Sequence, residues 1–231
     1  MSQRVTRPCG IKFAKIDKKY GSLYALRRLD LEITAGECVA LTGRNGSGKT
    51  TLLRIASQLI RPTRGELSFP ELGPGEAPAI GYVSHAVMIY EELTAEENLL
   101  LFARLLGIAH PKKRAAELLE ATGLTTRKDA AARTFSRGMK QRLAIARALL
   151  EEPSMLLLDE PGTGLDTDSM AWLTATIRAL RDQGRTIVMS VHGESSLSQV
   201  ATRAARLDSG GLVADTRNGA TFQNVFATGV A

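Results

Sequence analysis

Apolar and polar positions along the chain follow two different periods, which indicates an α/β protein. Short apolar runs of the kind found in buried parallel strands end in glycine, aspartate or histidine, and segments with helical spacing separate them. The predicted strands are 37–41, 80–84, 155–159 and 186–191. A helix is predicted over 49–60, and Pro62 ends it. This order of elements predicts a mostly parallel sheet covered by helices.

Strand-like runs are missing between the second and third of these strands, and three helices are predicted instead. Thr94 and Glu97 form a capping box that opens the first helix. Pro111 opens the second helix, and Gly123 closes it. Ser136 caps the third. Its apolar stripe consists of Met139, Leu143, Ala146 and Leu150.

The chain is therefore expected to be one domain, 1–231, made of two parts. An α/β core would comprise 11–93 and 152–215. The helical segment, 94–151, would be inserted into it as a subdomain, and 216–231 would form a tail.

Composition narrows the class of protein. With 44% hydrophobic and 23% charged residues, the chain has enough apolar side chains for a packed core. No apolar run approaches the ~18–20 residues that span a bilayer, so any membrane function requires a second chain. Cys9 and Cys38 have no metal-ligand spacing and fit a reducing compartment. The net charge of +6 fits a solvated face, and attraction to anionic lipid or nucleic acid stays open.

A phosphate-binding motif follows the first predicted strand. Residues 43–50 read Gly-Arg-Asn-Gly-Ser-Gly-Lys-Thr and match G-x-x-x-x-G-K-[ST] in full. Small residues let backbone N–H groups converge on phosphates at a helix N-terminus, while Lys49 reaches the β- and γ-phosphates and Thr50 ligates Mg²⁺. The residues expected to bind ATP are Gly43, Arg44, Asn45, Gly46, Ser47, Gly48, Lys49, Thr50 and Thr51.

Two carboxylates follow the apolar strand 155–158. Asp159 is expected to hold Mg²⁺ through its hydration shell. Glu160 is expected to orient the attacking water and to accept its proton. The pair is a strong signal here because it comes after the phosphate-binding loop and before Pro161-Gly-Thr-Gly-Leu-Asp166.

At this point the chain resembles the ABC ATPase family, from about residue 11 to about residue 208. Residues 135–142, Phe-Ser-Arg-Gly-Met-Lys-Gln-Arg, stand where the family has its Leu-Ser-Gly-Gly-Gln signature, and Ser136 and Gly138 match it. The resemblance implies that these two residues bind the ATP held by the opposite subunit of a head-to-tail homodimer or heterodimer. It also implies a P-loop NTPase (RecA-like) core with N-terminal antiparallel strands and an inserted helical subdomain.

The resemblance assigns roles to three further residues. Tyr20 matches the aromatic side chain that stacks on adenine. His192 matches the histidine that contacts the γ-phosphate. Asp166 matches the loop that crosses the dimer interface, and a role as helix N-cap is compatible with that.

One position departs from the family pattern. His85 stands eight residues before Leu93, where most members have a Gln that ligates Mg²⁺ through its amide oxygen and couples the site to the membrane partner. Mg²⁺ prefers oxygen ligands, so an imidazole is a poor direct substitute. His85 is still placed among the catalytic residues, and two roles stay open, action through water or coupling alone.

The same departure narrows the resemblance to one subfamily of ABC ATPases. Tyr-Val-Ser-His at 82–85, followed by Leu-Thr-Ala-Glu-Glu-Asn-Leu at 93–99, is similar to the ATP-binding subunit of the bacterial heme exporter of cytochrome c maturation. We therefore expect an ATP- and Mg²⁺-dependent hydrolase that powers export through a separate integral membrane subunit. Heme is the first candidate cargo. The hydrolase would be peripheral at the cytoplasmic face of the inner (plasma) membrane, with 93–136 presenting the docking groove.

Other hypotheses stay open. The chain would serve a different export system for lipid, polysaccharide or drug if the heme resemblance fails. A soluble ABC ATPase acting on DNA or the ribosome usually has long coiled-coil insertions or two ATPase units, and 231 residues leave room for neither, so no nucleic-acid partner is expected. Glu160 and His192 argue against a non-hydrolytic nucleotide sensor, whereas His85 keeps that hypothesis open. A P-loop kinase gives no reason for Ser136 and His192.

Overall fold

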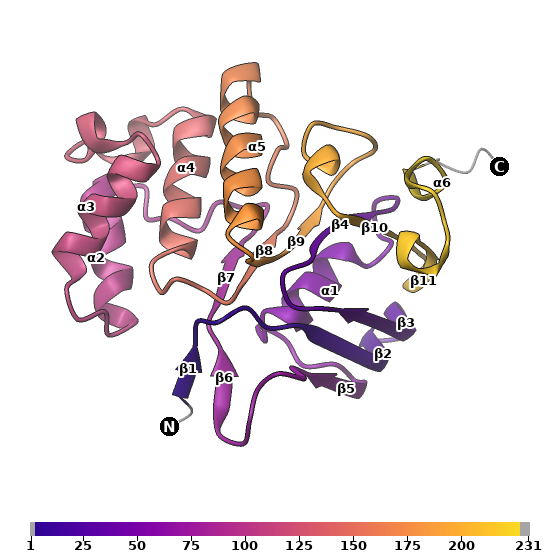
Figure 1. The fold of residues 1–231 in the computed structure, drawn as a ribbon. Coiled ribbons are helices and arrows are strands. Elements are labelled where there is room, and N and C mark those ends of the chain that lie inside the picture. Colours follow the sequence, from indigo (N-terminus) through magenta and orange to yellow (C-terminus); the bar gives the residue numbers. More distant parts are fainter. Residues whose placement is uncertain (1–2, 227–231) are drawn as a thin grey trace.

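A six-stranded sheet forms the centre of the fold, which a computed structural model describes for residues 3–226 (Figure 1). The strand order is β11-β10-β4-β9-β8-β7, and every neighbouring pair is parallel except β10 and β11. The strands are β4 (Cys38–Thr42), β7 (Ile80–Val83), β8 (Met155–Leu158), β9 (Thr186–Ser190), β10 (Arg203–Asp208) and β11 (Gly211–Asp215). Because β4, β8 and β9 are buried along their whole length, they carry continuous apolar runs.

Smaller sheets lie beside the central one. An antiparallel sheet has the order β3-β2-β5, from β2 (Ile11–Tyr20), β3 (Leu23–Ile33) and β5 (Arg64–Ser68). Strand β1 (Gln3–Val5) pairs in parallel with β6 (Glu76–Pro78). Helix α1 (Lys49–Ala56) shares one hydrophobic core with β2, β3 and one face of the central sheet.

Helices cover the other face and extend to one side (Figure 1). They are α2 (Ala95–Leu105), α3 (Pro111–Ala121), α4 (Arg137–Ala148), α5 (Thr167–Asp182) and α6 (Phe222–Phe226), with 3₁₀ turns at Thr125–Arg127, Ala132–Thr134, Ser198–Val200 and Thr216–Asn218. Helix α4 joins two cores. Ala144, Ile145 and Ala148 pack with α5 against the sheet, whereas Leu143 and Ala146 pack with α2 and α3. The helical segment is thereby fixed to the sheet through α4.

The structure confirms the predicted fold class and the predicted helix signals. Thr94 Oγ1 accepts from Glu97 N, and Glu97 Oε2 accepts from Thr94 N, which completes the capping box. Pro111 begins α3, and Ser136 caps α4. Gly123, two residues after α3, has a φ of 67°, which suits a glycine past a helix end.

One helix boundary was predicted wrongly, and the segment predicted as a tail has secondary structure of its own. Helix α1 ends at Ala56, before the predicted 60, because Gln58 adopts a left-handed φ of 60° and turns the chain. Residues 216–226 of the predicted tail form a 3₁₀ turn and α6, because Val225 and Phe226 are buried against the core; 227–231 lie outside the described residues. Within 3–226, no helix has the length and apolar character needed to cross a bilayer.

Candidate nucleotide-binding site

The loop between β4 and α1 has the backbone that the phosphate-binding motif requires. Gly43 has a φ of 139°, and a Cβ there would lie 2.2 Å from Leu207 O. Gly48, the N-cap of α1, has a φ of 106°, and a Cβ there would lie 2.6 Å from Ala25 O. Both positions therefore need glycine. The buried hydroxyl of Ser47 has no hydrogen-bond partner among the described residues, so it is available to a phosphate.

Lys49 brings a cation into this loop from the first position of α1. The residue is 5% exposed, and its Nζ donates to Gly43 O at 2.7 Å and to Arg44 O at 3.2 Å. Burial lowers the pKa of Lys49, while the charges of Glu160 and Asp159 act in the opposite direction. The ammonium group is held where it can meet phosphate oxygens.

Asp159 and Thr50 form an oxygen pair beside the loop. Thr50 Oγ1 donates to Asp159 Oδ1 at 3.1 Å, and Ser190 Oγ donates to the same oxygen at 2.8 Å. Asp159 is buried. A carboxylate and a hydroxyl fit Mg²⁺, which also keeps water and phosphate oxygens as ligands. Residues 3–226 contain no cluster of three or more His, Cys, Asp or Glu side chains that could hold a metal ion.

Glu160 lies between two histidines. Its Oε1 is 2.7 Å from His192 Nε2, and its Oε2 is 3.4 Å from His85 Nδ1. Its backbone N–H donates to Ser190 Oγ at 2.7 Å, and its φ of 51° is unusual for a residue other than glycine. The structure thus fixes both the backbone and the carboxylate of Glu160.

The signature residues form a second cluster, at the N-terminal ends of α4 and α5. Ser136 Oγ accepts from Met139 N at 3.2 Å, and Asp166 Oδ1 accepts from Ser169 N at 2.8 Å. That hydrogen bond lowers the pKa of the Asp166 carboxyl. Gly138 is buried against Ser169 of α5. The cluster makes these bonds within its own helices, and Ser136 is exposed.

The remaining candidates are placed as follows. Tyr20 is the exposed last residue of β2, and its ring centroid lies 5.2 Å from Lys18 Nζ. His85 faces Glu160 rather than the Thr50–Asp159 pair. Sequence reasoning missed Ser190, which contacts both Asp159 and Glu160. The signal was present, because Ser190 is a polar residue at the carboxyl end of a buried strand.

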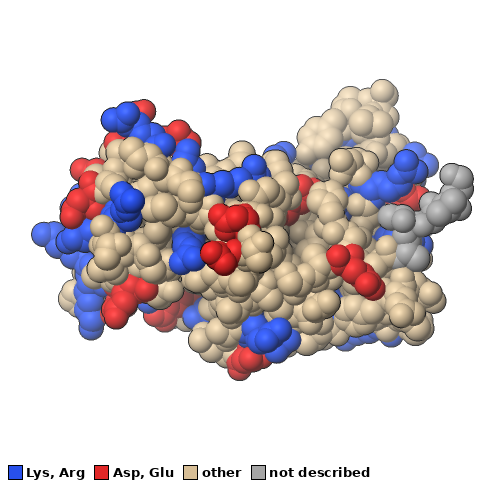
Figure 2. All heavy atoms as spheres, turned by 90° about the horizontal axis from the view of Figure 1, so that it is seen from above, with Lys and Arg blue, Asp and Glu red and all other residues tan. Residues whose placement is uncertain are grey.

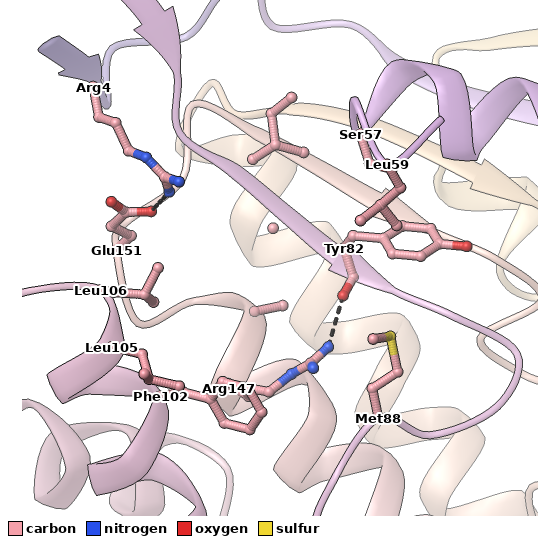
Figure 3. Close-up of a pocket in the computed structure, with 13 residues that line it drawn as sticks. Arg4, Ser57, Leu59, Tyr82, Met88, Phe102, Leu105, Leu106, Arg147 and Glu151 are labelled. Atoms are coloured by element: carbon pink, nitrogen blue, oxygen red, sulfur yellow. Dashed lines mark hydrogen bonds and ion pairs between the residues drawn. The ribbon is translucent and has the colours of Figure 1, made fainter. Parts of the chain in front are cut away.

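A separate groove lies between the sheet and the helical segment (Figure 3). Its volume is about 260 Å³. Arg147 crosses its floor, where Nη2 donates to Tyr82 O at 2.9 Å, and Arg4 pairs with Glu151 at one end. The exposed apolar side chains along it are Leu59, Met88 and Leu105. The groove thus combines α2, which lies within 93–136, with residues outside that segment.

Comparisons with known proteins agree with this arrangement. Residues 26–163 match the family model described as "ABC transporter". The linearmycin resistance ATP-binding protein LnrL of Bacillus subtilis is 34% identical over 206 residues, 86% of this chain and 66% of its own length. The Nod factor export ATP-binding protein I of Cupriavidus pinatubonensis is 32% identical over 212 residues, 89% of this chain and 65% of its own length. The chain thus spans just under two thirds of both relatives.

Among solved structures, a dimeric ATP-binding cassette in a post-hydrolysis state, bound to ADP and Pi, is similar to this chain. Its TM-score is 0.80 at 28% sequence identity, over 89% of this chain and 97% of that one.

Proposed function

The chain belongs to the ABC transporter family of ATP-binding subunits, and we propose that it hydrolyses ATP to drive export through a separate integral membrane subunit. One observation carries the proposal, namely the convergence of Lys49, Thr50, Asp159 and Glu160 on one phosphate-binding loop. Cassettes of this family are ATPases, and the similar dimeric cassette was captured after hydrolysis.

The residues divide the chemistry among them. The loop N–H groups and Lys49 bind the phosphates, and Tyr20 stacks on the adenine. Thr50 and Asp159 would hold Mg²⁺, which offsets phosphate charge when it is bound. Glu160 orients the attacking water and accepts its proton, while His192 holds the Glu160 carboxylate.

A dimer completes the site. Ser136 is an exposed hydroxyl at the N-terminus of α4, where backbone N–H groups favour phosphate. We propose that it binds the ATP held by a second subunit, with Gly138 allowing the close approach and Asp166 at the interface. The similar cassette is also dimeric.

The groove provides the proposed docking site for the membrane subunit (Figure 3). Leu59, Met88 and Leu105 are each about half exposed or more and line the same groove, and apolar side chains exposed together in this way mark interaction sites. Their partner is proposed to be a short amphipathic segment on the cytoplasmic side of the membrane protein. This interaction would place the chain, as a peripheral protein, at the inner face of the plasma membrane.

Phosphate release by the purified chain tests the proposal. We expect turnover that requires both ATP and Mg²⁺ and that stops when EDTA removes the metal. Tight ATP binding without turnover, in the presence of the membrane subunit, would instead support the nucleotide-sensor hypothesis.

For the cargo, heme is the specific candidate that the residues favour, because His85 and the surrounding 82–85 and 93–99 segments resemble the heme exporter ATPase. The named relatives serve linearmycin resistance and Nod factor export, so another small-molecule cargo is the second candidate. Heme-stained gels of a deletion strain separate the two. Loss of c-type cytochromes, with other heme proteins retained, supports heme export; normal c-type cytochromes contradict it.

A nucleic-acid-directed ATPase is less consistent with the one face of the molecule that Figure 2 shows. On the face shown in Figure 2, Lys and Arg side chains are interspersed with Asp and Glu and do not form one continuous basic area. A backbone-binding protein needs such an area to neutralise phosphates.

A further inference from the structure

The register of three neighbouring strands brings two histidines to one carboxylate. Val83 of β7 pairs with Leu158 of β8, and Leu158 pairs with Met189 of β9. His85 and Glu160 each follow two residues after their paired positions, and His192 follows three residues after Met189. Since parallel strands end at the same edge of a sheet, Glu160 emerges between the two imidazoles.

The contacts are consistent with that register. His192 Nε2 meets one oxygen of Glu160 at 2.7 Å, and His85 Nδ1 faces the other at 3.4 Å. The His85 side chain is 55% exposed, so it has room for the small rotation that shortens its contact to a hydrogen bond. Catalytic hydrogen bonds are often long before substrate binds.

We propose that His85 is a positioning residue for Glu160, acting on the catalytic base and not on the metal. This inference rests on the proposed ATPase function. His192 at Oε1 and His85 at Oε2 hold the carboxylate from two sides, and Ser190 fixes the backbone N–H of the same residue. Together these contacts keep the carboxylate in the orientation that directs it to water.

The chemistry of the neighbouring groups favours a role of His85 in positioning Glu160 over a role in binding the metal. The oxygen pair suited to Mg²⁺ is Thr50 and Asp159, 3.1 Å apart, and the His85 contact is with Glu160 instead. A hard cation takes oxygen ligands, so imidazole nitrogen adds little to its binding. A carboxylate, in contrast, accepts an imidazole N–H readily.

The test compares His85→Leu and His85→Asn with His110→Leu as control. His110 is also an exposed histidine, and it precedes α3 without a side-chain capping bond. In asparagine the amide nitrogen is attached to Cγ, as Nδ1 is in histidine, so His85→Asn keeps a donor near the same place. Steady-state ATPase assays would give kcat, KM for ATP and the Mg²⁺ concentration for half-maximal rate, and thermal unfolding would check folding.

We expect His85→Leu to lower kcat about tenfold or more, with KM for ATP and the Mg²⁺ requirement within about twofold. His85→Asn should recover most of that loss, and His110→Leu should match the wild type. A wild-type kcat in His85→Leu overturns the inference alone. The inference is also overturned if His85→Leu needs more Mg²⁺ and regains the wild-type rate at saturating Mg²⁺. That result would assign His85 to the metal. No turnover by the wild type overturns the proposed function, and this inference with it.

Discussion

Lys49 shows, at the scale of one residue, how burial and function are linked. A buried ammonium group is costly unless it is paired, and here loop carbonyls and two nearby carboxylates compensate it. The pKa of Lys49 is lowered by that burial, yet its role requires a cation. The phosphates of ATP would add further negative charge beside the ammonium group and so favour its charged form.

The Lys49→Ala variant should therefore lose most ATP binding. Removing a charge-assisted contact that leaves its partner charge buried costs ~2–5 kcal/mol. Equilibrium binding of a fluorescent ATP analogue measures the loss. Lys112→Ala, at an exposed lysine of α3, is the matched control. Near-native affinity of Lys49→Ala would remove the assignment of 43–50 as the phosphate-binding loop.

The Glu160→Gln variant should keep ATP binding but lose nearly all turnover. The amide can still accept from His192 and orient water, but it cannot take the proton. Two ATP molecules should then hold two subunits together, and size-exclusion chromatography with ATP and Mg²⁺ should show a dimer. Adding Ser136→Arg should return the monomer, because a long side chain would fill the proposed phosphate site. Substantial turnover by Glu160→Gln would place the base elsewhere.

At the scale of elements, the sequence predicted those features that depend on local chemistry. The four strand runs were predicted to within a residue or two, and three of them, β4, β8 and β9, are buried on both faces. The capping box at Thr94 was predicted because both partners lie within one turn. The end of α1 was not predicted, because it depends on the left-handed conformation of Gln58. The presence of α6 was not predicted either, because it depends on the packing of Val225 and Phe226 against the core.

Gly138 has a structural role that sequence reasoning did not identify. A Cβ there would lie 2.0 Å from Ser169 Oγ and 2.8 Å from Ser169 Cβ, so glycine lets α4 approach α5. Gly138→Ala should destabilise the ATP-free protein by about 1–3 kcal/mol through overpacking. Urea unfolding would measure the change in free energy. Because Ser169→Gly removes the clashing side chain, the double variant should lose less than the sum of the single losses. Additive losses would show that this contact does not limit the packing.

At the scale of the whole molecule, the site assembles residues that local patterns cannot bring together. His85, Glu160 and His192 belong to three separate strand ends, and their meeting requires the strand order β9-β8-β7. The sequence identified each residue through its motif but assigned none of these contacts. The groove likewise joins Arg4, Leu59 and Glu151 from distant segments, which no local pattern in 93–136 could bring together.

The groove is also where a single charged substitution should weaken binding of the membrane subunit. Leu105 is 72% exposed and lines the groove, whereas Val213 is 52% exposed on β11 and does not line it. Leu105→Asp would place a carboxylate under the docked segment of the membrane subunit, where desolvation of the charge is unfavourable. A loss of about 2 kcal/mol, which is typical of a central contact, would weaken binding roughly thirtyfold.

The measurement is co-purification with the proposed integral membrane subunit, together with the ATPase rate of the isolated ATP-binding subunit. The Leu105→Asp variant should no longer co-purify with the membrane subunit but should keep its basal ATPase rate. The reason is that Leu105 lines the groove and is not among the residues around Glu160. Val213→Asp should behave as wild type in both assays, since it adds the same charge at another exposed apolar position. Equal capture by Leu105→Asp and wild type would exclude this groove as the docking site. A loss with both variants would assign the effect to added negative charge and not to the groove.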